Sequence, residues 1–165
     1  MNAIAKKTTT QVGTCEGTIG TERYVAVLVE YSEADNPPPQ GLSHFMRATQ
    51  IDANLKFKEL VFSFSKDRLD GQYSVDPDET AVELLFIDNT LQNNPVTYSK
   101  YKGIAILKFD VVSKVFSGTI VATLQTNDDV PILLDINVEF KCAPHVQAAR
   151  NPRRPSPPKH CRASK

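Results

Sequence analysis

Few residues in this sequence have types and spacings that could support chemistry, and metal binding is the first kind to consider. Cys142 and His145 lie three residues apart, and His160 and Cys161 are adjacent, so these four side chains could supply the thiolate and imidazole ligands that zinc prefers. The two pairs flank a proline-rich stretch, and their spacing does not match a compact zinc finger. We therefore expect no metal site and no cofactor.

Two acidic turns contain oxygen ligands of the kind that calcium binds. Asp76, Asp78 and Glu79 lie in one turn, and Asp128 and Asp129 lie in the other. Neither turn matches the spacing of an EF-hand loop. We expect both to be ordinary turns of the chain.

The sequence gives equally little support for catalysis. Ser43 and His44 are adjacent, but a nucleophile and its base must meet by side-chain geometry rather than by sequence. The chain has no G-x-S-x-G nucleophile elbow and no glycine-rich phosphate loop. We therefore expect a protein that is not an enzyme, with His44 on its surface.

The charge of the chain is divided between a body and a tail. Residues 143–165 contain six basic residues and no acidic residue, so the net charge of zero is +6 in this segment and −6 in residues 1–142. The segment is rich in proline and poor in large apolar residues, so it cannot bury enough surface to offset its conformational entropy. We expect a disordered, solvated tail. Its electrostatic contacts would come from Arg150, Arg153, Arg154, Lys159 and Arg162.

Two kinds of partner could recognise this tail. Nucleic acid would bind the basic side chains, but the acidic body opposes such binding and the tail has no aromatic residue to stack on bases. We therefore expect no nucleic-acid partner. The P-x-x-P spacings at 152–155 and 155–158 would suit a groove that binds polyproline II segments.

The clearest structural pattern lies between residues 103 and 141. Three apolar runs, at 103–112, 115–126 and 131–140, are separated by short polar turns, and along each run apolar residues mostly alternate with polar ones. This alternation predicts an antiparallel meander with one face exposed to solvent.

Other segments predict further strands. Residues 22–31 are apolar on both faces in their middle, which favours a central strand, whereas residues 44–55 fit either a helical turn or, as we prefer, a strand. Gly103 lies within a predicted strand and indicates a bulge or bend. The other strands are expected at 57–65, 71–75, 81–87 and from Val96 onwards.

Together these segments predict an all-β protein, a single antiparallel β-barrel or β-sandwich of about eight strands. The contiguous meander favours an up-and-down barrel. We expect a flexible N-terminus at 1–9, the β domain at 10–142 and the tail at 143–165.

The sequence also bears on the compartment of the protein. It contains neither an apolar run long enough to cross a bilayer nor the apolar segment of a signal peptide, so we expect a cytoplasmic protein without a membrane span. Export without a signal would leave the same sequence. Cys15, Cys142 and Cys161 are expected to be free thiols, the alternative being a Cys15–Cys142 disulfide in an exported protein.

Three short features lie along the second half of the body. They are the G-x-Y of Gly71–Tyr73, the S-G-T step of Ser117–Thr119 and the closing aromatic Phe140. In these features the chain resembles certain uncharacterised bacterial antiparallel β-domains. The resemblance implies a lipocalin-like or sandwich fold, and it assigns no activity and no functional residue.

Four apolar residues fall on strand faces that should be exposed: Ile104, Ile106, Val121 and Leu133. Three of them would be neighbours if the strands pair in chain order, and an exposed apolar patch often marks a binding surface. Cover by the N-terminal segment or by a dimer partner is the alternative. We expect a non-enzymatic binding domain for a protein partner or a small apolar ligand, or else an assembly protein that forms homo-oligomers through sheet edges or this patch.

Overall fold

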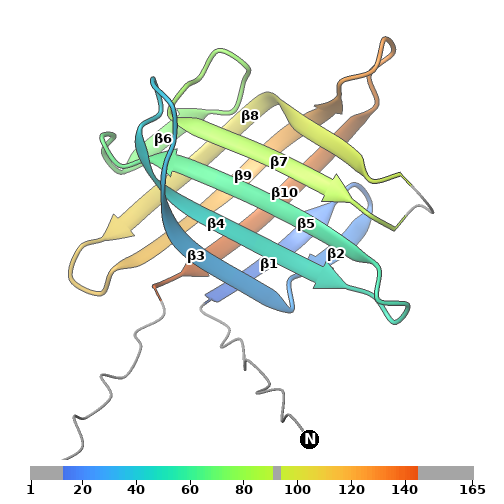
Figure 1. Ribbon diagram of the computed structural model, residues 1–165, viewed down its shortest axis with the longest axis horizontal. Helices are drawn as coiled ribbons and strands as arrows, with labels where there is room; N and C mark the ends of the chain where they lie inside the picture. Colours follow the sequence, from blue (N-terminus) through green and yellow to red (C-terminus); the bar gives the residue numbers. More distant parts are fainter. Residues whose placement is uncertain (1–12, 91–93, 145–165) are drawn as a thin grey trace, which may run out of the picture.

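The computed structural model describes residues 13–90 and 94–144, which form ten strands of a single antiparallel sheet (Figure 1). The expected all-β fold is confirmed, and the predicted tail lies almost wholly outside the described residues. Those two ranges contain no helix long and apolar enough to cross a membrane. The strands are β1 (Gly13–Ile19), β2 (Glu22–Val25), β3 (Leu28–Asp35), β4 (Leu42–Ile51), β5 (Phe57–Ser65), β6 (Gly71–Ser74), β7 (Val82–Asp88), β8 (Val96–Asp110), β9 (Val115–Thr126) and β10 (Leu133–Cys142).

The strand order is β2-β1-β10-β9-β8-β7-β5-β4-β3, with β6 paired to β8. The predicted meander is therefore confirmed as β8, β9 and β10. Ile120 on β9 lies opposite Ala105 on β8 and Val138 on β10, and all three side chains are buried. Since a slip of one residue would turn these side chains to solvent, their burial excludes such a slip.

Glycines allow the sheet to bend sharply. Gly17 has φ +154° and Gly103 has φ +146°, and a Cβ would lie 2.0 Å from Asn137 O at the first position and 2.4 Å from Ala122 Cα at the second. Only glycine fits so close to a neighbouring backbone. The bulge expected near Gly103 is present as a register shift between Lys100 and Lys102. Such bends curl the sheet toward a barrel.

The predicted central strand at 22–31 is wrong. This stretch forms β2 and β3, which lie at opposite ends of the strand order. Between them, Ala26 N–H donates to Cys15 O on β1 at 2.9 Å, and Val27 N–H donates to Thr49 O on β4 at 2.8 Å. The chain thus changes its pairing partner within two residues, and the two ends of the curled sheet meet there.

Aromatic and aliphatic side chains fill the concave side of the sheet. The ring of Phe116 on β9 lies 5.1 Å from that of Phe140 on β10, and 6.1 and 6.3 Å from those of Phe62 and Phe64 on β5. Phe62, Phe116 and Leu124 have no exposed surface, so no water-sized space adjoins them. The concave side is a packed core at these positions, rather than a cavity for a ligand.

Replacing Phe116 by alanine tests this packing. We expect Phe116→Ala to lower the free energy of unfolding by about 3–5 kcal/mol, because it removes a buried ring and leaves a cavity. Urea denaturation followed by circular dichroism measures the change. Val112→Ala, in the exposed turn between β8 and β9, is the control and should change stability by less than about 0.5 kcal/mol. Equal effects of the two variants would contradict the packing described here.

Candidate functional site

The structure brings three of the four predicted patch residues together. Ile104 on β8 lies directly opposite Val121 on β9, and Ile106 lies two residues further along the same face of β8. All three are exposed. Leu133 pairs with Gln125, four residues from Val121 along β9, which places it about 13 Å away. We call Ile104, Ile106 and Val121 the outer patch, and Leu133 lies outside it.

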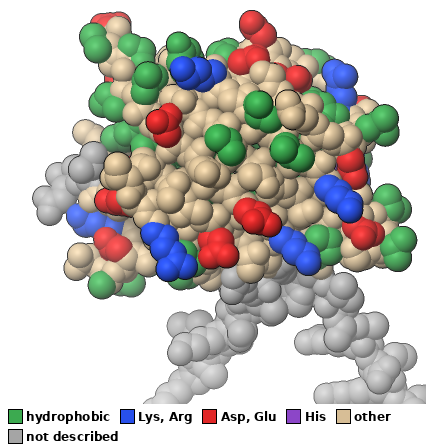
Figure 2. Space-filling view, turned by 180° about the vertical axis from the view of Figure 1, so that it is seen from behind, with side chains coloured by type: hydrophobic (Ala, Val, Ile, Leu, Met, Phe, Trp, Pro, Cys, Tyr) green, Lys and Arg blue, Asp and Glu red, His purple; other side chains and the backbone are tan. Residues whose placement is uncertain are grey.

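Uncharged polar residues adjoin the outer patch on β9 and β10, and lysines flank it along β8, where Lys102 and Lys108 lie two residues from Ile104 and Ile106 on the same face. Thr119 lies opposite Ile106, and Asn137 on β10 lies opposite Val121. Figure 2, which views the molecule from behind, shows a few hydrophobic side chains in the middle of a largely uncharged face, with charged side chains nearer its margin. The five basic tail residues that were predicted to make electrostatic contacts, from Arg150 to Arg162, lie outside the described residues. Within the described residues, this face is therefore the only predicted binding surface.

A second candidate site is a cleft of about 540 Å³ next to the beginning of β4 and the end of β8. His44 lines it and is only 4% exposed, so the expectation of a surface histidine is wrong. Nδ1 of His44 lies 2.8 Å from Tyr31 Oη, and the imidazole ring stacks on Phe109 at 4.4 Å and on Phe116 at 4.9 Å. These contacts fix the orientation of the ring.

The surroundings of His44 favour a neutral imidazole. Burial, and secondly the positive charge of Lys66, hold the pKa of His44 below its ordinary value of 6.5, against the opposing effects of Glu33 and Asp70. Burial raises the pKa of Tyr31 to about 12, so the phenol keeps its proton and can donate it to Nδ1. In that arrangement Nε2 carries the ring proton.

Ser43 and His44 do not form a catalytic pair. Successive residues of a strand point to opposite faces, and Ser43 Oγ donates to Gly41 O at 3.0 Å. The burial of His44 could have been found from strand parity, because it shares a face with Met46 and Ala48, which are wholly buried.

Lys100 is a buried cation that sequence analysis missed. Its Nζ donates to Val82 O at 2.7 Å, to Glu79 O, and to Glu83 Oε1 at 3.0 Å. Three acceptors satisfy the three donors of the ammonium group. The contacts of Lys100 are therefore structural, and they hold the bulged part of β8 against β7.

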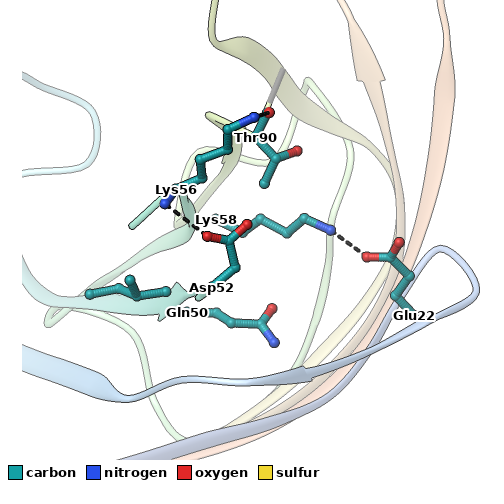
Figure 3. Close-up of a pocket in the computed structure, with 7 residues that line it drawn as sticks. Glu22, Gln50, Asp52, Lys56, Lys58 and Thr90 are labelled. Carbon is teal, nitrogen blue, oxygen red and sulfur yellow. Dashed lines mark hydrogen bonds and ion pairs between the residues drawn. The ribbon is translucent and has the colours of Figure 1, made fainter. Parts of the chain in front are cut away.

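A polar hollow of about 320 Å³ lies near the turn that follows β4 (Figure 3). Lys58 forms an ion pair with Glu22, and Lys56 Nζ donates to Thr90 O at 2.8 Å. Asp52 Oδ1 accepts the backbone N–H of Lys56 at 3.0 Å. These polar groups bind one another, so the hollow is built by contacts that already have a structural role.

The acidic turn at residues 76–79 also has a structural explanation. Asp76 Oδ1 accepts the backbone N–H groups of Asp78 and Glu79 at 3.0 and 2.9 Å, and Glu79 Oε1 accepts that of Ala81 at 2.8 Å. Within the described residues no group of three or more His, Cys, Asp or Glu side chains could hold a metal ion. Three of the four residues considered as candidate zinc ligands, His145, His160 and Cys161, lie outside these residues.

Cys15 and Cys142 are buried free thiols on adjacent strands. Cys15 lies opposite Phe140, and Cys142 lies opposite Gly13. Burial is the main cause that raises the pKa of each thiol to about 12, so the thiolate is scarce near neutral pH.

Comparison with protein-family models, with curated proteins and with solved structures gives no match for this chain.

The buried thiols should react slowly. In a Cys161→Ser background, in which only Cys15 and Cys142 remain, we expect the folded protein to resist Ellman's reagent at about pH 8, because both thiols are protonated and covered. Absorbance should rise quickly only after guanidinium is added. Prompt labelling of either thiol in the folded protein would contradict their burial.

Protonation of His44 should destabilise the fold. Because the pKa of His44 is lower in the folded protein than in the unfolded chain, the unfolded state binds the proton more tightly. The free energy of unfolding should therefore decrease as the pH is lowered from about 7.5 to about 5.5. Urea denaturation at each pH measures the slope.

The variant His44→Gln should show a flatter slope over this range. The matched control carries His145→Gln and His160→Gln, which replaces the other two histidines of the chain, and it should keep the slope of the original protein. The assignment of the slope to His44 fails if the control, rather than His44→Gln, removes it.

Proposed function

We propose that this protein is a non-enzymatic interaction domain that binds a protein partner through the outer patch. The observation that carries the proposal is the register of β8 and β9, which sets three large exposed apolar side chains, Ile104, Ile106 and Val121, next to one another. Exposed apolar residues that are scattered singly need no explanation, whereas a contiguous apolar cluster with a polar rim is typical of an interaction surface.

The position of the patch within the sheet specifies how a partner would bind. β9 is paired with β8 on one side and with β10 on the other. Its backbone N–H and C=O groups are therefore used within the sheet, and an added strand cannot pair with them. A partner would instead pack on side chains, with the isoleucines and Val121 at the centre of the contact.

Residues around the patch would complete an interface of ordinary size. A stable interface buries about 800 Å² on each partner, which is more than three side chains can supply. Thr119, Asn137 and Lys102 adjoin the patch, and Asp135 lies two residues beyond Asn137 at its edge. The arrangement has an apolar centre and a polar rim, as interfaces commonly do.

Self-association is a second candidate, and one observation favours it. Lys102 on β8 and Asp135 on β10 both lie opposite Thr123 on β9, one on either side. A two-fold axis that lies over β9 and runs parallel to it would place each Lys102 over Asp135 of the second copy. It would also place Val121 over its own copy and Ile104 over Asn137. The same surface would then form both halves of the interface.

Substitutions with matched exposure test the proposal. We expect Ile104→Lys and Ile106→Lys to abolish binding of the partner, because each places a charge at the centre of the contact. Their controls are Ile51→Lys and Ile132→Lys, since Ile51 is 44% exposed against 43% for Ile104, and Ile132 is 57% exposed against 55% for Ile106. All four variants should keep the circular dichroism spectrum of the original protein.

Native mass spectrometry of the full chain, purified from its own host, provides the readout. A dimer that is lost only in the patch variants would identify self-association, and a second protein lost only in these variants would identify a different partner. If the original protein is a bare monomer, or if the patch variants keep the partner, the proposal is wrong.

A further inference from the structure

The cleft beside His44 has the features of a small-molecule site and is separate from the outer patch. Its volume of about 540 Å³ lies within the range of about 300–1,000 Å³ that is typical of ligand pockets. Phe64 and Phe109 contribute apolar surface, and Leu69 and Val111 line the same cleft while remaining 84% and 77% exposed. A ligand with an apolar body would cover these two side chains.

His44 presents one unused polar atom in this cleft. Nδ1 is bound to Tyr31 Oη, and the ring faces pack on Phe109 and Phe116. Within the described residues, Nε2 has no hydrogen-bond partner. Every fully buried side-chain nitrogen or oxygen in these residues does have a partner, so Nε2 is not fully buried. Nε2 of this largely buried residue therefore still reaches solvent, which is where the cleft lies. With Nδ1 accepting from Tyr31, Nε2 is a hydrogen-bond donor.

Among the charged residues that line the cleft, which are Lys66, Arg68 and Asp70, one basic side chain is available to an anion. Lys66 is paired with Glu33 at 2.6 Å, and Asp70 Oδ1 accepts the backbone N–H of Phe109 at 2.9 Å. Arg68 lines the cleft and, among the residues that the structure describes, forms no ion pair. A guanidinium group binds a carboxylate with matching geometry. Arg68 is thus the cation that remains available to a ligand.

We propose that this cleft binds a small monocarboxylate with an apolar body. The carboxylate accepts a hydrogen bond from Nε2 of His44 and pairs with Arg68, and the apolar body packs on Phe109, Leu69 and Val111. His44 acts as a neutral donor that is fixed in place before the ligand arrives, so binding does not require the ring to be ordered.

Three probes with the same eight-carbon body test the chemistry of the head group. The full-length, ¹⁵N-labelled protein is titrated with octanoate, 1-octanol and octylammonium, and amide and His44 ring signals are followed by NMR. We expect saturable octanoate binding with a dissociation constant of about 1 mM or tighter, at least tenfold weaker binding of octylammonium, and intermediate binding of octanol. Shifts should centre on His44 and Phe109. Equal affinities for the three probes, or shifts centred elsewhere, would overturn the proposal.

Two surface substitutions test the site without touching the core. Arg68→Gln should weaken octanoate binding at least fivefold, and Leu69→Asp should weaken it at least tenfold by placing a negative charge beside the carboxylate. The controls are Arg23→Gln and Leu55→Asp, because Arg23 is also an exposed arginine and Leu55 is also 84% exposed. Equal losses in a site variant and its control would overturn the assignment. These outcomes do not depend on the outer patch, so the two proposals can fail separately.

Discussion

The packing of Phe116 is the interaction on which the rest of the structure depends. β9 and β10 are separated from β3, β4 and β5 by two other strands in the sheet order. The ring of Phe116 nevertheless contacts Phe62 and Phe64 on β5, Phe140 on β10 and His44 on β4. It therefore joins the two halves of the curled sheet across its concave side. The cleft depends on the same contact, because Phe116 is one of the rings that orient the imidazole of His44.

The two candidate sites use different faces of one strand. Ile104 and Ile106 point outward from β8, whereas Phe109, near the end of the strand, turns its ring toward His44. Alternation along a strand makes such a division possible without a second domain. Packing of the core positions the cleft, while the outer patch needs only the register of β8 and β9. A family of proteins with this fold could therefore change one site and keep the other.

Local alternation in the sequence was enough to predict the meander, and a glycine within a strand was enough to predict the bulge at Gly103, because both features depend on neighbours in the chain. The division of residues 22–31 between two strands was not predictable in this way. This division depends on two hydrogen bonds to distant strands. Ala26 N–H donates to Cys15 O and Val27 N–H donates to Thr49 O, and both acceptors are within reach only when the sheet has curled. Likewise, the distance of Leu133 from Val121 follows from the register of β9 and β10, and alternation alone does not fix that register.

The pairing of β1 with β10 sets the order of events during synthesis. Ile19 lies opposite Ile136, so β1 leaves the ribosome about 120 residues before its neighbour exists. At about 5–20 residues per second, β1 would wait about 6–24 s for this partner. During that time only β2, the next strand along the chain, can pair with it. The nascent chain thus carries an incomplete sheet edge until β10 has been made, and a chaperone that covers this edge would act on β1 rather than on β10.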